Sequence, residues 1–274
     1  MILDCHIHIE DQLDEPGIFA AKLTEAGVDG GIVFSMYPPS FFNGTPEPGD
    51  AQRRIAQVMA FTKDHPRLYP FYFIDPTDPD ATEQVDLAVK AGIRGFKVIC
   101  THHYPQDPRA LPVYAHIAKA GKPMLFHSGI LYNPGPSGDF NRPCNFEHLF
   151  YIENLRFALA HISWPWCDEL ISVFGKWNSC SGRTAHGIKS EMFVDLTPGT
   201  PTLYREEALT KLLTVGYGAM PSHMIFGTDA ASVYDVEMVT GYIKRDNAIY
   251  DKLGIDGQTR AQIYGKNLLA FLGE

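Results

Sequence analysis

Residues 1–8 read MILDCHIH, an apolar run that ends in a His-x-His pair. Side chains alternate between the two faces of a β-strand, so we expect His6 and His8 to share a face. The same alternation predicts that Cys5 points away from them, as a small core residue. If the strand belongs to an α/β barrel, the histidine pair lies at its C-terminal end, where barrel enzymes carry their active sites.

Apolar and amphipathic stretches alternate along the rest of the chain, which predicts parallel strands covered by helices on both faces. Eight such units in 274 residues fit a (β/α)8 TIM barrel of the α/β class, formed as a single domain over residues 1–274 with C-terminal helices. The predicted strands are residues 1–8, 30–36, 68–74, 92–100, 123–129, 156–163, 192–196 and 224–228. The predicted helices are residues 16–26, 51–64, 80–91, 110–120, 146–154, 166–177, 203–215, 255–264 and 266–272.

Composition excludes several classes of function. The net charge of -9 argues against nucleic acid or an anionic membrane as the main partner, because both require a clustered positive field. The five cysteines are odd in number and include no CxxC pair, so free thiols are expected. No apolar run reaches the ~18 residues of a membrane span, and no signal-peptide pattern opens the chain. We therefore expect a cytoplasmic protein that acts on a small molecule.

Polar side chains fall at the ends of several predicted strands. Burying so many of them unpaired in one small volume would cost several kcal/mol, and a shared cation removes that cost. Imidazoles and a carboxylate suit Zn²⁺ or another divalent first-row ion, which can lower the pKa of a bound water toward about 7. The alternative is a set of ordinary core histidines. The strand-end residues are His6, His8, Lys97, His127, His161 and Asp229.

These motifs together resemble the amidohydrolase superfamily. The sequence is most similar to its amidohydrolase 2 group, which includes metal-dependent hydrolases and relatives of aminocarboxymuconate semialdehyde decarboxylase. The resemblance covers essentially the whole chain. It is carried by the His-x-His pair, by FHSG, LAHIS and FGTD around His127, His161 and Asp229, and by the closing GKNLLAFL of residues 265–272.

The resemblance implies a role for each motif residue. His6, His8, His127 and Asp229 would be metal ligands of one Zn²⁺, while Asp229 and His161 would serve as catalytic residues that move protons. The alternative is a pair of metals bridged by a carboxylated Lys97, with His161 as an additional ligand. A homodimer is a further expectation at the level of the family.

Substrate contacts are expected from Lys97, Arg142 and Trp164. A guanidinium such as that of Arg142 could bind a substrate carboxylate, although a solvated loop arginine is the alternative. Trp164 could equally pack against the next helix. The loops at residues 37–50 and 130–145 are long enough to form pocket walls. The loop histidines His102 and His103 are expected to be solvated, and the alternative is that either one faces the pocket and contacts the substrate.

The predicted activity is hydrolysis of an amide, lactone or other ester bond by metal-activated water. The alternative is a non-oxidative, metal-dependent decarboxylation of a small carboxylic acid, because both reactions use the same set of ligands. A non-catalytic binding protein on a barrel fold is a third possibility, since a fold alone does not establish an activity.

Overall fold

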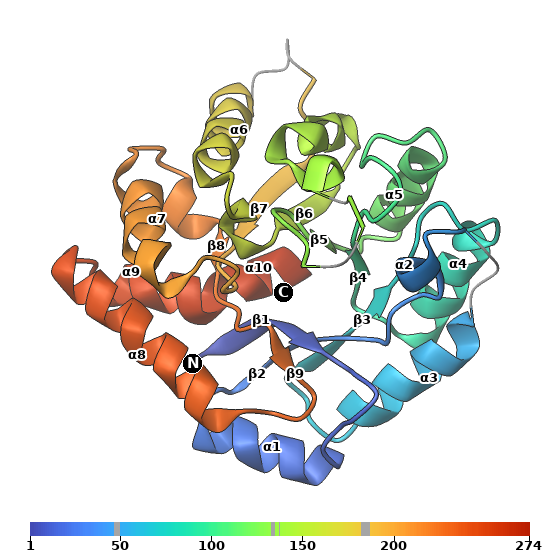
Figure 1. The fold of residues 1–274 in the computed structure, drawn as a ribbon, viewed down its shortest axis with the longest axis horizontal. Helices are drawn as coiled ribbons and strands as arrows, with labels where there is room; N and C mark the ends of the chain where they lie inside the picture. Colours follow the sequence, from blue (N-terminus) through green and yellow to red (C-terminus); the bar gives the residue numbers. More distant parts are fainter. Residues whose placement is uncertain (47–49, 133–134, 137, 182–186) are drawn as a thin grey trace.

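The strands of this protein line a central axis, and helices surround them (Figure 1). The computed structural model describes residues 1–46, 50–132, 135–136, 138–181 and 187–274. All strand pairings are parallel, in the order β8-β7-β6-β5-β4-β3-β2-β1-β9, which confirms the predicted TIM barrel. The strands are β1 (Leu3–His8), β2 (Gly30–Phe34), β3 (Leu68–Phe73), β4 (Gly95–Val98), β5 (Met124–Phe126), β6 (Arg156–Leu159), β7 (Glu191–Asp195), β8 (Met224–Ile225) and β9 (Ala230–Ala231).

The last unit closes the ring in two pieces, where the sequence predicted one strand over residues 224–228. Met224 pairs with β7, and Ala230 pairs with Ile7 of β1. Between the two pieces, the Phe226 carbonyl accepts a hydrogen bond from the backbone N–H of Cys5 at 2.9 Å. The break between β8 and β9 contains Asp229, whose φ is 60°. A pleated strand cannot continue through this left-handed conformation, so the chain turns there.

The helices lie mostly where their apolar periodicity predicted them. Two differences are clear: residues 143–151 form a 3-10 helix in place of the predicted helix over 146–154, and β6 ends at Leu159 because residues 161–163 have φ values of 48–61°. Among the described residues, no helix is both long and apolar enough to cross a bilayer. The helices are α1 (Pro16–Glu25), α2 (Ser40–Asn43), α3 (Ala51–Thr62), α4 (Ala81–Ala91), α5 (Ala110–Lys119), α6 (Cys167–Cys180), α7 (Thr202–Thr214), α8 (Val236–Lys252), α9 (Gly257–Ala261) and α10 (Asn267–Leu272), with 3-10 turns at Gly138–Asn141, Pro143–Tyr151, His161–Ser163 and Met220–Ser222 and a π-helical turn at Gln262–Lys266.

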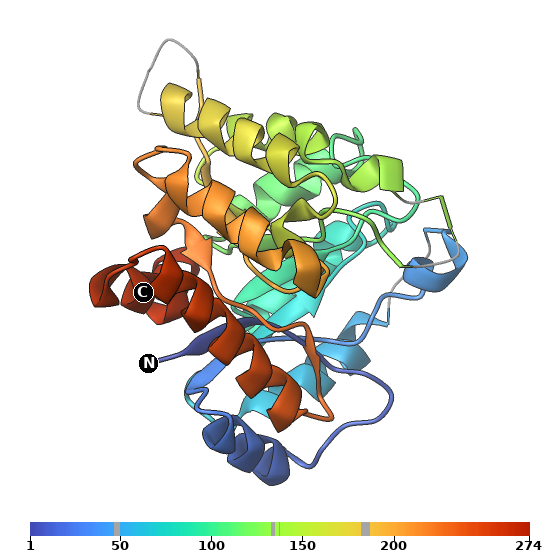
Figure 2. The same ribbon diagram turned by 60° about the vertical axis from the view of Figure 1, so that its left-hand side comes forward.

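Two apolar cores flank the strands. The outer core lies between strands and helices, and the inner core fills the part of the barrel where the strands begin. Helix α10 closes that end, with the Phe271 ring 5.2 Å from that of Phe193 and 6.5 Å from that of Phe71. Figure 2 shows the red C-terminal helices beside the start of the first strand. The described residues therefore close the barrel interior at the end where the strands begin.

Strand β1 contains an irregularity that the sequence did not predict. Its register against β2 shifts between Asp4 and Ile7. As a result Cys5 belongs to the inner core while Ile7 belongs to the outer one. The expectation that strict alternation turns Cys5 away from the histidines is wrong, because a bulge changes which face each residue presents. Cys5 is nevertheless a buried core residue, and burial raises the pKa of its thiol.

Candidate active site

Three donor atoms from two ends of the chain converge at the open end of the barrel. The Nε2 atoms of His6 and His8 lie 3.1 Å apart. Oδ1 of Asp229 lies 3.4 Å from Nε2 of His6 and 3.5 Å from Nε2 of His8. The bulged first strand brings the two histidines together, and the turn between β8 and β9 brings the carboxylate to them.

This triangle has the dimensions of a metal site. Donors about 2.1 Å from a zinc ion at tetrahedral angles are roughly 3.4 Å apart, close to all three observed separations. His6 and His8 are buried, and burial, reinforced by neighbouring positive charges, holds their pKa values well below the ordinary range. Neutral imidazoles have a lone pair to offer, so the residues fit a divalent first-row ion.

Asp195, at the end of β7, orients His6. Its Oδ2 accepts a hydrogen bond from Nδ1 of His6 at 2.7 Å, which leaves Nε2 of His6 to face the other donors. Its Oδ1 is held by the backbone N–H of Thr197 at 2.7 Å and by the Thr197 hydroxyl. A carboxylate behind a ligand histidine fixes its tautomer and raises its basicity. Asp195 was not singled out from sequence, although it ends a strand like the other site residues.

Lys97 lies inside the barrel with the histidines. Its Nζ is 3.3 Å from Nε2 of His6 and 5.0 Å from the centroid of the Phe34 ring. The residue is completely buried, and burial lowers the pKa of its ammonium group despite the nearby carboxylates of Asp195 and Asp229. A lysine in this place can bind a negatively charged group or, in its neutral form, react with carbon dioxide.

His127 and His161 complete the ring of imidazoles. Their ring centroids are 4.8 Å apart, and the His161 ring is 5.1 Å from that of His6. Nε2 of His127 and Nδ1 of His161 are buried and have no hydrogen-bond partner among the described residues. Burial lowers the pKa of both rings, that of His127 to about 3. Donor atoms of His6, His161 and Asp229 lie within 4.8 Å of one another, so His161 is placed to bind an ion or to move a proton.

Two of these residues occupy strained backbone. His161 and Asp229 have φ values of 61° and 60°, in the left-handed region that non-glycine residues rarely adopt. Such strain, of order 1–3 kcal/mol each, persists where surrounding contacts determine the conformation, and it is common at functional sites. The turn at Asp229 is held by buried Asp4, which accepts hydrogen bonds from the backbone N–H of Thr228 at 3.0 Å and from its hydroxyl.

Close packing below the turn requires glycine at position 227. A Cβ there would lie 2.2 Å from Oγ1 of Thr197, 2.8 Å from Sγ of Cys5 and 3.1 Å from Cβ of His6. These separations are too short for any side chain. The glycine of the FGTD motif therefore lets the eighth unit approach the first strand, which places Asp229 beside the histidines.

Aromatic side chains form one wall of the pocket above these residues. Tyr37 stacks on His8, with ring centroids 5.6 Å apart, and packs against Phe41 at 4.5 Å. The cavity has a volume of about 540 Å³, a size typical of small-molecule sites. Residues 47–49, 133, 134 and 137 of the two expected wall loops lie outside the described residues. The lining consists of His6, His8, Glu10, Tyr37, Phe41, Phe42, Lys97, Ile99, Ile130, Leu131, Tyr132, His127, His161, Pro198, Gly199 and Asp229.

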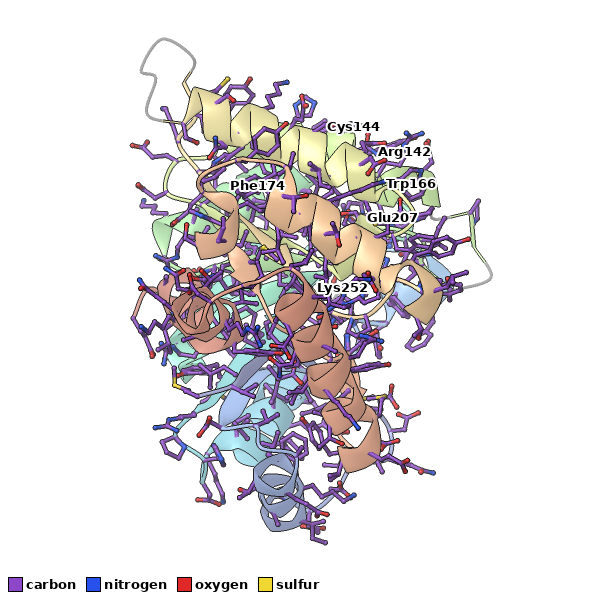
Figure 3. All side chains as sticks on the ribbon, turned by 90° about the vertical axis from the view of Figure 1, so that its left-hand side faces the viewer. Arg142, Cys144, Trp166, Phe174, Glu207 and Lys252 are labelled. Atoms are coloured by element: carbon purple, nitrogen blue, oxygen red, sulfur yellow. The ribbon has the colours of Figure 1, made fainter. Side chains whose placement is uncertain are left out.

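Arg142 and Trp164 lie outside this lining. The Arg142 guanidinium pairs with Glu169 at 2.6 Å and stands 5.3 Å from the Trp166 ring, near the start of α6 in the outer helix layer (Figure 3). Trp164 stacks on Tyr204 at 4.8 Å and lines a separate surface hollow of about 460 Å³ between α6 and α7. The structure thus brings Lys97 to the histidines but does not bring these two residues there.

A second cluster lies beside the barrel mouth. His102 and His103 follow β4, and Asp75 follows β3. The expectation that these two loop histidines are solvated is wrong, because His103 is 2% exposed and the His102 side chain 15% exposed. Burial here comes from packing between neighbouring loops, which the sequence of one loop does not reveal.

Comparison with known proteins shows the family and the fold of this chain. The family described as Amidohydrolase matches residues 3–273. No curated protein matches. Solved structures with the same fold include one described as a probable 2-pyrone-4,6-dicarboxylic acid hydrolase from Acinetobacter baumannii, with 12% identity, a TM-score of 0.61 and coverage of 100% of this chain and 99% of that one. A dihydroorotase from Campylobacter jejuni has 15% identity, a TM-score of 0.59 and coverage of 100% and 83%. Amidohydrolase 2 from Bifidobacterium longum subsp. infantis has 12% identity, a TM-score of 0.56 and coverage of 99% and 98%.

Proposed function

Because this chain belongs to the amidohydrolase family and is therefore an enzyme of that type, we propose that it cleaves an amide, lactone or other ester bond of a small organic substrate. The observation that carries the proposal is the triangle of His6, His8 and Asp229, with edges of 3.1–3.5 Å. With His127 these residues would hold one divalent ion, and the nitrogen-rich donor set favours Zn²⁺. When bound, such an ion polarises a carbonyl group and acidifies water.

Proton transfer is assigned to Asp229 and His161. Burial raises the pKa of Asp229, although the Lys97 ammonium group opposes this, so the carboxylate can accept a proton at Oδ near neutral pH. About 40% of its side chain remains exposed to the pocket, where a substrate can reach it. His161, neutral and beside Asp229, would pass a proton toward the leaving group.

Substrate binding is assigned to Lys97, at the floor of the pocket inside the barrel, and to the aromatic wall formed by Tyr37 and Phe41. Lys97 supplies a positive charge at the floor, suited to a substrate carboxylate or a polarised carbonyl. Tyr37 and Phe41 provide flat apolar surfaces, which favour a ring or another planar group. The expected substrate is therefore small and planar, with one acidic group beside the bond that is cleaved.

The test is metal-dependent turnover of a substrate panel. Chelated protein is reloaded with Zn²⁺ and assayed against lactones, aryl esters and cyclic amides, with and without a carboxylate, and against aromatic carboxylic acids for release of carbon dioxide. We expect hydrolysis that requires the metal and is strongest for substrates carrying a carboxylate. Release of carbon dioxide without hydrolysis would overturn the proposal in favour of a decarboxylase.

The number of metals is tested separately. The axial site is the set of His6, His8, His127 and Asp229. Elemental analysis gives the metal content per chain, and intact mass under conditions that retain a lysine carbamate shows whether Lys97 bridges a second ion to this site. We expect no added carbon dioxide mass on Lys97. A carbamate would make Lys97 and His161 ligands of a second ion in the axial site.

A further inference from the structure

Asp75, His102 and His103, here called the peripheral cluster, lie at the ends of β3 and β4, outside the pocket lining described above. One donor atom from each of the three residues lies within 4.8 Å of the others. Two imidazoles and one carboxylate are a common donor set for divalent transition ions, and they do not suit Mg²⁺ or Ca²⁺, which prefer oxygen ligands.

The carboxylate of the cluster is fixed and ionised. Oδ1 of Asp75 accepts hydrogen bonds from the backbone N–H of Thr77 at 2.8 Å and from its hydroxyl at 2.7 Å, while Oδ2 is 3.2 Å from Nε2 of His102. Burial acts against ionisation, but the hydrogen bonds, first that of His102, outweigh it and hold the pKa of Asp75 below its ordinary value. The second ring nitrogen of His102 lies 2.9 Å from the Thr101 hydroxyl, which orients the ring.

An ion pair between Asp75 and His102 does not explain why His103 is buried beside them. It is 2% exposed, and neither of its ring nitrogens has a hydrogen-bond partner among the described residues. Its ring lies 5.0 Å from that of His102. Burial lowers its pKa to about 4, so the ring is neutral and its lone pair is available. An unpaired buried imidazole is costly unless something binds it, and a metal ion would satisfy it.

We propose that the peripheral cluster of Asp75, His102 and His103 binds a second divalent transition-metal ion, of the Zn²⁺ class, independently of the axial site. Such an ion would join the loops that follow β3 and β4. The loop after β2 packs on the same cluster, since a Cβ on Gly44 would lie 3.8 Å from Cβ of His102. That loop carries Phe41 and Phe42 of the pocket wall, so the ion would stabilise the wall without contacting substrate.

The experiment removes the axial donors first. The variant His8→Ala/Asp229→Ala is stripped with chelator, checked for folding by circular dichroism, reloaded with Zn²⁺ and analysed for bound metal after gel filtration. We expect about one ion per chain, and thermal stability that rises with added Zn²⁺. Adding His103→Gln should remove that ion and abolish the rise, whereas His116→Gln, at a half-buried histidine paired with Asp86, should leave both unchanged.

A second route covers failure of the double variant to fold. In the otherwise unaltered chain, His103→Gln or Asp75→Asn should lower bound Zn²⁺ by about one ion per chain and keep metal-dependent turnover measurable. A folded double variant that binds no Zn²⁺, or Zn²⁺ content that does not respond to His103→Gln and Asp75→Asn, overturns the proposal and assigns the His103 nitrogens to buried water. Neither result bears on hydrolysis at the axial site, so the two proposals fail separately.

Discussion

The two ends of the barrel interior are built by the same strands but consist of opposite chemistry. Where the strands begin, Leu3, Phe71 and Phe193 pack with Phe271 of α10 into an apolar layer. Where they end, the same interior holds imidazoles, carboxylates and an ammonium group. Both layers are buried, so burial alone does not separate stability from function. The difference is that the apolar layer is satisfied by its own contacts, while the polar layer contains nitrogens, such as Nε2 of His127, that have no hydrogen-bond partner in the described part of the chain.

Substitutions in the two layers should therefore have opposite effects on stability and on chemistry. Truncation in the apolar layer should weaken the fold and leave the chemistry of each folded molecule intact. Substitution in the polar layer should weaken the chemistry and leave the fold intact or strengthen it, because charged and unpaired polar groups are costly to bury.

The largest effect is expected from Asp229→Asn. The amide cannot accept the proton that we assign to Oδ, so kcat/KM should fall about 10³- to 10⁴-fold. The free energy of unfolding of the metal-free protein should stay the same or increase, because the raised pKa of Asp229 means that the folded state disfavours the ionised carboxylate that the substitution removes. Steady-state kinetics and urea denaturation measure the two quantities. Asp64→Asn, at an exposed carboxylate beside Lys63, is the matched control and should change neither.

Phe271→Ala is the corresponding substitution in the apolar layer. Removal of a fully buried ring should lower the free energy of unfolding by about 3–5 kcal/mol. Zn²⁺ bound per folded molecule should not change, because α10 closes the end of the barrel opposite the site. Leu203→Ala, at a side chain that is largely exposed, should have an effect within about 0.5 kcal/mol. Loss of metal from folded Phe271→Ala would show that the layers are not independent.

Asp195→Asn tests whether the hydrogen bond from His6 to the Asp195 carboxylate strengthens metal binding. The amide keeps the shape of the side chain but binds Nδ1 of His6 less strongly and no longer carries the charge that raises the basicity of the ring. Zn²⁺ affinity should fall about 10- to 100-fold, measured by competition with a chromophoric chelator. An unchanged affinity would mean that Asp195 stabilises the fold, as the apolar layer does, and does not support the metal ligands.

The smallest effect concerns pH. Burial holds the pKa of His161 far below the value of about 6.5 for an unfolded histidine, so only the unfolded chain takes up this proton as the pH falls. The stability that the neutral His161 ring contributes is present above pH 6.5 and is lost at lower pH. Between pH 7 and pH 6 the metal-free protein should lose about 0.7 kcal/mol more stability than His161→Gln does. Equal losses, measured by urea denaturation, would mean that His161 is protonated in the folded state.

The polar layer could be predicted from sequence to the extent that strands position it. His6, His8 and Lys97 lie together inside the barrel because each lies in the C-terminal half of a strand, and the C-terminal ends of parallel strands meet on one side of the barrel. Asp195 obeys the same rule and could have been found by it. What the rule could not predict was the register shift in β1, because a bulge depends on how two strands pair and not on the sequence of one.

Loop residues were predicted less well, for a physical reason. The positions of Arg142, Trp164 and His103 depend on contacts between loops that are distant in sequence. Arg142 is held by Glu169, Trp164 by Tyr204, and His103 is enclosed by its surroundings. A charge or a ring in a loop indicates what a residue can bind but not which surface it faces.

The bulge in β1 also sets a condition for protein design. A regular strand with a His-x-His pair facing the axis would turn the residues at positions 3 and 5 outward, into the helix layer. In this protein the shift lets Leu3 and Cys5 fill the interior directly below the two histidines. Transplanting the pair onto an idealised scaffold would therefore require the bulged strand together with its neighbour β2, so the smallest portable unit of this site is a distorted strand pair and not a three-residue motif.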